Sequence, residues 1–270
     1  MLYSHFSPSS SAHSNLQSSF VLSLSECRTG IPRHDSIVLH VILYRALTPH
    51  SQKNSPFVHR VWISLEHKSL AYQYIEVDVY RKPKLLLDIN PRGLVPALRH
   101  GDWGSYESTV LMEYLEDAFP DAAHPLLPAS ARQRAHARLW ADHVNRHVIP
   151  NFYRYLQAQS ESDVVEHGKE LQTQIGKLVD AADGQGPFFL GEEMGFVDVQ
   201  IAPWVVRLKK VLGPYRGWPE PEEGTRWKKW VDAIEGNEAV RKTTSGDELY
   251  LDSYERYAGE FARLVFCLLF

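Results

Sequence analysis

The sequence is poor in cysteine. Its 270 residues include only two, Cys27 and Cys267, one near each end of the chain. Two distant cysteines make neither a disulfide scaffold nor a Cys-based zinc site, and no Cys-x-x-Cys pair occurs. This scarcity favours a reducing compartment, and we therefore expect a cytoplasmic protein.

The sequence also lacks a strong charge of one sign and a long apolar run. Lys and Arg total 29 against 33 Asp and Glu, which gives a net charge of −4. This balance argues against a nucleic-acid partner held by bulk positive charge. No apolar run approaches the roughly 18–20 residues that span a bilayer, so we expect no membrane partner. The hydrophobic content of 44% instead predicts a globular chain with a core.

The two ends differ in composition from the middle. Residues 1–36 are rich in Ser and His and are predicted to form a disordered leader, with a degraded targeting signal around residues 20–24 as the alternative. Residues 261–270 are strongly apolar but too short to cross a bilayer. This apolar tail either docks on the body of the protein or promotes association.

Residues 37–122 have the pattern of a small α/β domain. Residues 38–44 form a nearly continuous apolar, β-branched run, typical of a strand covered on both faces. Ser55 and Pro56 then suit the N-cap and N1 positions of a helix, because apolar residues follow at helical spacing. The remaining pattern predicts strands at 72–77, at 94–98 and from Trp103, a short helix after Pro83 and a helix at 107–119. The order is β-α-β-α-β-β-α.

Residues 130–260 are predicted to form an all-α domain. The amphipathic pattern indicates helices at residues 132–148 with a continuation after Pro150, and at 162–182, 197–212, 227–234 and 248–258. A packed loop at 188–191 and a surface loop at 214–224 separate some of them.

Three short motifs admit both a structural and a functional interpretation. Val95-Pro96 lies in a predicted strand. A cis peptide bond before Pro96 would expose the backbone of Val95 for pairing with an extended peptide, whereas a trans bond would indicate an ordinary edge strand. Glu107-Ser108 begins a helix, either as an anion site or as a plain cap. Ser55 either caps its helix or donates a hydrogen bond to a thiolate at the positive end of the helix dipole. Taken singly, no motif decides between its two interpretations.

In this order, the motifs together resemble the glutathione transferases. The α/β part carries Ser-Pro-Phe-Val-His-Arg-Val-Trp-Ile at 55–63, Asn-Pro-Arg-Gly-Leu-Val-Pro-Ala-Leu at 90–98 and Tyr-Glu-Ser at 106–108. The helical part carries Gly-Pro-Phe-Phe-Leu-Gly at 186–191, Phe-Val-Asp-Val at 196–199 and Ala-Pro-Trp at 202–204. The similarity covers residues 38–258 and is greatest to the omega and lambda classes, within a filamentous-fungal branch.

The resemblance implies a thioredoxin-like domain followed by an all-α domain, usually in a homodimer. It implies that the backbone of Val95, before Pro96, pairs with the cysteinyl part of glutathione, and that Glu107 and Ser108 hold the γ-glutamyl end. Lys82 falls where the omega class uses a lysine near the glycyl carboxylate, and it equally suits a solvated lysine.

Tyr153 and Trp204 fall where the family lines its acceptor pocket, whereas their pattern alone indicates core. Asp198 matches the helix-capping aspartate of the family. Gly195 stands where the family usually has Ser or Thr, so half of that capping box is missing.

Ser55 departs from the omega and lambda pattern, which usually has a cysteine there. A hydroxyl does not form a mixed disulfide with glutathione, but it can hydrogen-bond to the glutathione thiolate and lower the pKa of that thiol. Residues 45–54 form a longer loop than is usual in the family. That loop either closes over the site or displaces Ser55 from it, and Thr48, Ser51 and Asn54 are alternative donors in that case.

His136, His143 and His147 fall on one face of a predicted helix, and the last two have the i, i+4 spacing of a metal chelate. No flanking acid completes a ligand set, so a solvated histidine-rich face is the preferred interpretation and no metal is predicted.

Our functional hypothesis is a cytoplasmic, serine-type glutathione transferase, with Ser55 as its catalytic residue. It would activate the co-substrate glutathione for conjugation to, or reduction of, small electrophilic or peroxidic compounds, among them hydrophobic and aromatic ones. One alternative is a non-catalytic, ligandin-like binding protein for aromatic small molecules. Others are a glutathione-dependent thioltransferase or dehydroascorbate reductase, and a scaffold that uses its helices for protein contacts.

Overall fold

The computed structural model describes residues 39–44, 55–78 and 81–269. The expectations for the leader at 1–36, for the loop at 45–54 and for Cys27 concern residues outside this part of the chain. Within the described ranges, no helix combines the length and the apolar character that crossing a membrane requires.

Four strands form one mixed sheet in the order β2-β1-β3-β4. The strand β1 (Leu39–Tyr44) pairs in parallel with β2 (Tyr72–Val77) and antiparallel with β3 (Ala97–His100). The strand β4 (Trp103–Tyr106) completes the sheet as an antiparallel partner of β3. With the helices between them, the strands confirm the predicted order β-α-β-α-β-β-α.

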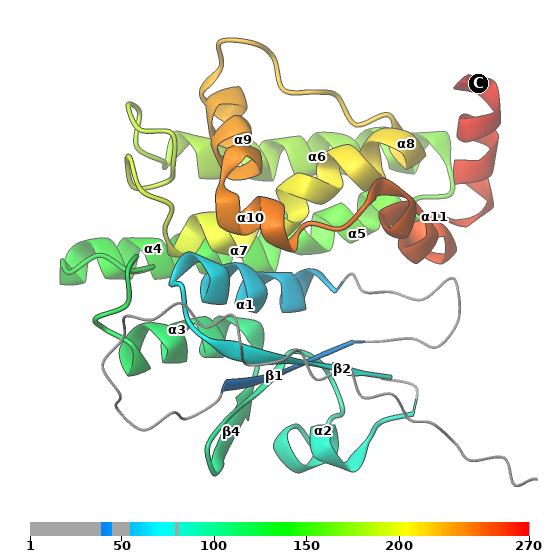
Figure 1. The fold of residues 1–270 in the computed structure, drawn as a ribbon. Coiled ribbons are helices and arrows are strands. Elements are labelled where there is room, and N and C mark those ends of the chain that lie inside the picture. The colour runs from blue at the N-terminus through cyan, green and yellow to red at the C-terminus, as the bar shows by residue number, and fades with distance from the viewer. Residues whose placement is uncertain (1–38, 45–54, 79–80, 270) are drawn as a thin grey trace, which may run out of the picture. The chain divides into compact units, whose positions relative to one another are not determined.

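Helices cover both faces of this sheet (Figure 1). The helices α1 (Pro56–His67) and α3 (Ser108–Ala118) lie on one face, and α2 (Lys84–Ile89) lies on the other. Because neighbouring side chains of a strand point to opposite faces, Leu98 packs with α1 and α3 while Ala97 packs with α2. The first helix is therefore held between the sheet and the helical domain.

The third strand begins later than predicted. The sequence indicated residues 94–98, whereas β3 spans Ala97–His100. The Val95–Pro96 peptide bond is cis, and Pro96 has no N–H to donate to a ladder, so pairing starts after the proline.

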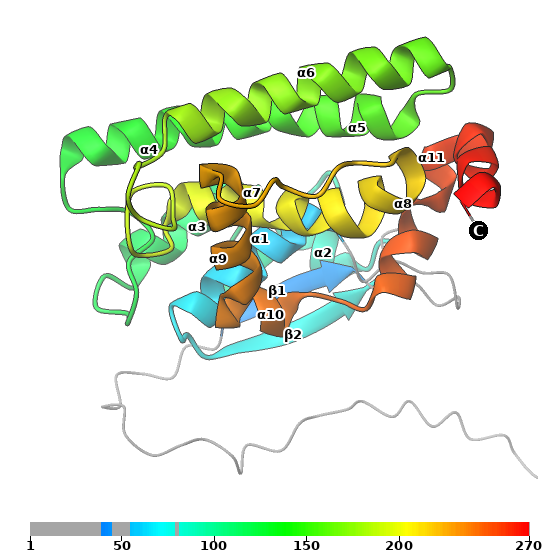
Figure 2. The same cartoon turned by 90° about the horizontal axis from the view of Figure 1, so that it is seen from above.

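The helical domain begins with one long, nearly continuous helical rod. The helix α4 (Ala131–His143), the π-helical turn η2 (Val144–Val148) and α5 (Ile149–Gln157) follow without a break. Pro150 is tolerated because it falls at the first turn of α5. The helix α6 (Glu161–Asp180) returns alongside α5 (Figure 2).

The helix α7 (Phe196–Arg207) lies in the middle of this domain, and all twelve of its residues are buried. The turn η3 (Leu208–Leu212) extends it, and the chain ends in α8 (Gly213–Arg216), α9 (Arg226–Gly236), α10 (Glu238–Thr243) and α11 (Asp247–Leu269). The predicted loop at 214–224 thus begins within α8. The helix α10 was missed because six residues are too few to show a helical period.

A buried ion pair joins the end of α1 to α3 and to the segment that leads into the helical domain. Lys68 Nζ lies 2.9 Å from Glu116 Oε2, and both side chains are nearly inaccessible to solvent. The carboxylate also accepts hydrogen bonds from the backbone N–H groups of Leu126 (2.9 Å) and Leu127 (3.2 Å). Those three partners hold the pKa of Glu116 below its ordinary value against the opposing effect of burial.

Candidate functional site

Ser55 occupies the N-cap of α1, as the sequence predicts. Its Oγ accepts a hydrogen bond from the Val58 N–H at 3.5 Å, and Pro56 follows in the first turn. Among the described residues this is the only bond to the hydroxyl, so the hydroxyl proton is available to a ligand. A hydroxyl in this place faces the unpaired N–H groups and the positive dipole end of a helix, where a thiolate is stabilised.

A tight turn lies immediately before Val95 and fixes the course of the backbone there. Asn90 Nδ2 donates to the Leu94 carbonyl at 2.8 Å, and Asn90 Oδ1 accepts from the Arg92 N–H at 3.1 Å. Gly93 has a φ of +64°, a conformation that favours glycine, and the end of the Lys82 side chain lies where a Cβ would point. The turn leads into the cis Val95–Pro96 bond at the entrance to β3.

Lys82 and Glu107 both contact this turn. Lys82 Nζ donates to the Arg92 carbonyl at 3.0 Å. The Arg92 guanidinium pairs with Glu107 at 2.5 Å, and both side chains are more than half exposed. The structure therefore brings Lys82, Glu107 and the turn before Val95 together, although Lys82 and Glu107 are far apart in sequence.

Glu107 and Ser108 form the start of α3. Glu107 has a φ of +73°, an unusual value for a residue with a side chain, and its carbonyl accepts the first helical bond, from Leu111. Ser108 is buried, and its Oγ lies 3.4 Å from Nη1 of Arg60. A positive charge therefore lies directly behind the predicted γ-glutamyl site.

Arg60 links the two domains at this point. Its Nε donates to the Gln200 carbonyl at 2.9 Å, and its guanidinium lies 4.5 Å from the ring centre of Trp204. The side chain is 1% exposed, and burial lowers the pKa of Arg60 to about 9, so it stays charged at neutral pH. Within the described residues, its Nη2 has no hydrogen-bond partner.

Sequence reasoning did not single out Arg60 or Arg92 as site residues. The signal for Arg60 was its position on the buried face of α1, where an arginine requires a partner. Arg92 lay in a recognised turn motif, but its partner Glu107 is 15 residues away.

Trp204 and Tyr153 occupy different surroundings in the helical domain. Trp204 is 1% exposed and packs edge-on against Phe57, at 5.3 Å between ring centres. Tyr153 lies among Phe152 and Tyr257, and burial raises the pKa of its hydroxyl. The exposed ring next to Ser55 is that of Phe57, two residues away in the chain.

The helical histidines bond to backbone groups. Nε2 of His143 lies 2.9 Å from the Gln174 carbonyl oxygen, and Nε2 of His136 lies 3.4 Å from that of Ala181. In the described part of the chain, no group of three or more His, Cys, Asp or Glu residues has the arrangement of a metal site.

Asp198 holds the start of α7. Its carboxylate accepts from the Gly195 N–H (2.8 Å), the Phe189 N–H (2.9 Å) and Trp230 Nε1 (2.6 Å). The aspartate half of the capping box thus operates although Gly195 has no side chain to complete it.

Two family models match the chain. The model of the glutathione S-transferase N-terminal domain matches residues 50–123, and that of the C-terminal domain matches residues 155–233. The structure of glutathione transferase Omega 3C from Trametes versicolor is 38% identical, with a TM-score of 0.72, over 83% of this chain and 92% of that one. The chain belongs to the glutathione S-transferase family.

The chain is also similar to two plant proteins. The structure of rice GST1 (OsGSTU1) in complex with glutathione is 30% identical, with a TM-score of 0.67, over 78% of this chain and 93% of that one. A probable glutathione S-transferase of rice (Oryza sativa subsp. japonica) named DHAR1, cytosolic, is 28% identical over 74% of this chain and 88% of its own length. The glutathione transferase fold, with a thioredoxin-like domain and a helical domain, and the enzyme class follow from these matches.

Proposed function

We propose that this glutathione transferase is a serine-type enzyme that uses Ser55 to activate the glutathione thiol. The observation that carries the proposal is the Ser55 hydroxyl, which caps α1 with its proton unused by any described residue. A hydroxyl donor and a helix N-terminus both favour the thiolate over the thiol, and they therefore lower the pKa of the bound thiol.

The residues around Ser55 suit the three parts of glutathione. The extended backbone at Val95 offers pairing to the cysteinyl part, next to Pro96. Ser108 and the free N–H groups of α3, backed by Arg60, suit the γ-glutamyl carboxylate, while the Glu107 carboxylate suits the ammonium group. Lys82, beside the same turn, suits the glycyl carboxylate.

The reaction follows from these positions. The thiol proton leaves to solvent, and the thiolate sulfur attacks the electrophilic carbon of the acceptor. A C–S bond forms as the leaving group departs with its electron pair, or the electron pair moves onto an acceptor double bond. With a peroxide, the sulfur attacks one peroxide oxygen, the O–O bond breaks, and the alkoxide leaves and is protonated to the alcohol. A second glutathione thiol then attacks the sulfur of the sulfenic acid, which forms the disulfide and releases the oxygen as water. We propose that the acceptors are small hydrophobic or aromatic compounds. The exposed Phe57 ring lies beside Ser55 in the chain, and the buried Trp204 ring packs edge-on against it.

A ligandin-like binding role for aromatic compounds remains the second proposal, and the same Phe57 surface favours it. Thiol transfer or dehydroascorbate reduction is the third, and a relative named DHAR1 supports it. A serine at position 55 opposes the third proposal, because these reactions proceed through a mixed disulfide with a protein cysteine.

We further propose a cytoplasmic homodimer of the fungal omega type. The likeness to an omega transferase of Trametes versicolor supports the class, and the relative named cytosolic supports the compartment. Exposed apolar side chains support the dimer: Trp103 on β4, Val110 on α3 and Leu139 on α4 are each more than 40% exposed. These elements adjoin one another, because Arg138 of α4 pairs with Glu113 of α3 at 2.6 Å and the Trp103 ring of β4 stacks on Tyr114 of α3.

The decisive experiment compares the wild type with Ser55→Ala. Turnover of glutathione with 1-chloro-2,4-dinitrobenzene should fall by about 10²–10³ in kcat, as expected on loss of one donor to a developing anion. The dissociation constant of glutathione, measured by calorimetry, should change less than about threefold, because Ser55 contacts only the thiol. Equal turnover in both proteins would exclude a catalytic role for Ser55. Tight binding of aromatic ligands by both, without turnover in either, would establish the ligandin-like role instead.

A further inference from the structure

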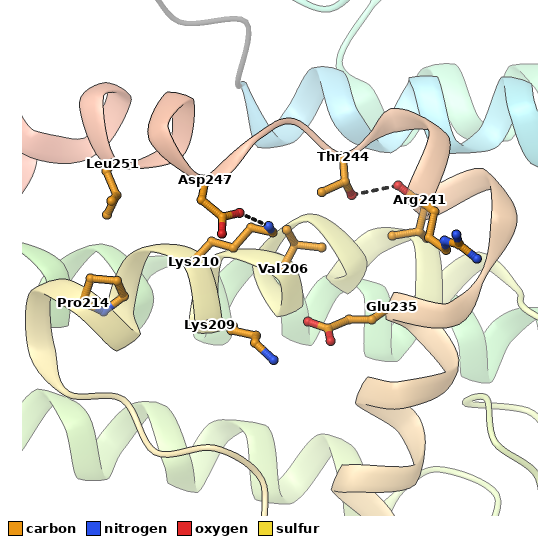
Figure 3. Close-up of a pocket in the computed structure, with 10 residues that line it drawn as sticks. Val206, Lys209, Lys210, Pro214, Glu235, Arg241, Thr244, Asp247 and Leu251 are labelled. Carbon is orange, nitrogen blue, oxygen red and sulfur yellow. Dashed lines mark hydrogen bonds and ion pairs between the residues drawn. The ribbon is translucent and has the colours of Figure 1, made fainter.

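The helical domain contains a cavity of about 490 Å³ that none of the predicted glutathione-site residues lines. Figure 3 shows that its walls come from the end of α7, from η3 and α8, and from the facing helices α9, α10 and α11. Its size lies within the range of about 300–1,000 Å³ that is typical of small-molecule sites.

Part of the wall is apolar and part is charged. Val206, Pro214, Val240 and Leu251 supply the apolar surface. The charged side chains are three cations and two acids: Lys209, Lys210, Arg241, Glu235 and Asp247. This mixture suits an amphipathic ligand more than a purely apolar one.

The positive charges of the cavity wall outnumber the negative ones. Lys210 and Asp247 form an ion pair and neutralise each other. Two cations, Lys209 and Arg241, then remain against the single carboxylate of Glu235. Lys209 contacts Glu220 only at 3.7 Å, in a pair whose side chains are both more than half exposed, so that pair is weak.

Among the described residues, Arg241 has fewer polar contacts than Lys209 or Lys210. Within the described residues, its guanidinium makes no hydrogen bond and no ion pair, although a five-donor fork is the usual partner of a carboxylate or sulfonate. The acid one turn before it, Glu238, is already paired with Lys242 at 2.7 Å. Arg241 and Lys242 are therefore adjacent on α10, with the first lining the cavity and the second engaged outside it.

Glu235 opposes an anion only in part. It is half-buried at the cavity, and burial raises the pKa of its carboxyl above the ordinary value, against the opposing effect of Lys209. Burial therefore disfavours the charged form of the Glu235 carboxyl, which lessens its repulsion of a bound anion.

We propose that this cavity binds an amphipathic organic anion, with its apolar body on Val206, Val240 and Leu251 and its carboxylate or sulfonate on Arg241 and Lys209. The site is separate from the one at Ser55 and does not depend on the function proposed there. A bound ligand would contact the end of α7 and the helices α9, α10 and α11 at the same time, since each of them contributes to the wall.

The test uses the full chain and the fluorescent sulfonate 8-anilinonaphthalene-1-sulfonate, titrated with S-hexylglutathione present to fill the glutathione cleft. Arg241→Gln should weaken dye binding about tenfold, which corresponds to one charge-assisted contact. Lys177→Gln on α6 is the control and should leave binding unchanged, because this exposed lysine lies outside the cavity. Glu235→Gln should tighten binding by roughly twofold to fivefold, because it removes a negative charge from the cavity wall.

Two outcomes would overturn the proposal. Equal dye affinity in Arg241→Gln and Lys177→Gln would show that the sulfonate is not held at this cavity. Complete displacement of the dye by S-hexylglutathione would place it in the glutathione cleft instead. Since both Arg241 and Lys177 are exposed, neither substitution threatens the fold, and unfolding curves of the two variants verify this.

Discussion

At the scale of single residues, the proposed chemistry depends on one atom of Ser55. In that proposal the oxygen at the start of α1 donates a hydrogen bond to the glutathione thiolate, whereas a sulfur in the same place would itself be the nucleophile. The N-cap geometry and Pro56 set the position of the side chain at residue 55, whether it ends in oxygen or in sulfur. Exchange of the Ser55 oxygen for sulfur should therefore change the reaction and leave the fold intact.

We predict that Ser55→Cys gains glutathione-dependent thiol transfer. The helix N-terminus should lower the pKa of the new thiol, so that it forms a mixed disulfide with glutathione. The assay is reduction of 2-hydroxyethyl disulfide, where the wild type should show less than about a tenth of the variant's rate. Failure of the folded variant to reduce the disulfide would mean that position 55 lies outside the site.

Arg60 should act as a positioning residue for Ser108. Arg60→Met keeps most of the side-chain volume but removes the guanidinium that lies 3.4 Å from Ser108 Oγ. We expect the KM for glutathione to rise about fivefold to tenfold with a smaller change in kcat, because the lost contact supports binding and not the reacting sulfur.

A double-mutant cycle separates this role from a general loss of stability. Ser108→Ala should raise the KM by a similar factor, and the double variant should cost little more than either single one, because Arg60 acts through Ser108. Additive effects on the KM would contradict this, as would full retention of glutathione affinity in Arg60→Met.

At the scale of secondary-structure elements, the two ends of α1 serve different purposes. Its N-terminus offers polar groups to a ligand, and its C-terminus is buried against the helical domain. His67 lies there with its ring 5.1 Å from that of His124, and its Nε2 has no partner among the described residues. Burial, aided by the nearby His124 and Lys68, lowers the pKa of His67 from 6.5 to about 4.

This buried end of α1 should make the fold sensitive to acid. The folded protein binds a proton at His67 less readily than the unfolded chain does between pH 6.5 and about 4. The free energy of unfolding should therefore be undiminished above pH 6.5 and fall by about 3 kcal/mol as the pH is lowered through this interval. Urea unfolding at a series of pH values measures it.

His67→Leu provides the control for the acid sensitivity. The variant removes the titrating ring, so its free energy of unfolding should fall by about 3 kcal/mol less between pH 6.5 and 4 than that of the wild type. Parallel pH profiles for the two proteins would assign the sensitivity to other groups.

At the scale of the whole molecule, the arrangement of the helices leaves apolar side chains exposed on adjoining elements. Leu139 of α4 is 63% exposed and Val110 of α3 is 51% exposed. Exposed apolar side chains that gather on neighbouring elements mark protein contacts more often than isolated ones do.

We predict that Leu139→Glu weakens the proposed homodimer by at least about tenfold in dissociation constant, because it would place a charge in the proposed apolar contact. Light scattering after size exclusion, over a dilution series, measures the shift. Val165 on α6 is 50% exposed and lies outside this group, so Val165→Glu is the matched control. The same dissociation in both variants, or in neither, would exclude this surface as the contact.

Several elements could be predicted because their signals are local. The Ser55-Pro56 cap, the second strand and the alternation of helices and strands depend on residues within a few positions of one another. The start of β3 and the helix α10 were misjudged for the opposite reason. Pairing partners decide where a strand begins, and packing against α1 stabilises a six-residue helix that has no distinct period of its own.

The candidate site divides in the same way. Val95, Glu107 and Ser108 could be chosen from motifs, but Arg60 and Arg92 could not, because their partners lie 48 and 15 residues away. The cavity at Arg241 likewise collects side chains from α7 to α11, and no stretch of sequence indicates that they meet.

Caps, periodicity and ordered motifs depend on local spacing, and they were enough to predict the two-domain fold, the family and a serine at the start of α1. Which charges are paired follows from the packed fold instead. It places Arg60 behind Ser108 and Lys68 against Glu116, and among the described residues it leaves the Arg241 guanidinium without an ion pair at a cavity. Ion pairing depends on distances of a few ångströms between distant parts of the chain, and the packed fold alone fixes those distances.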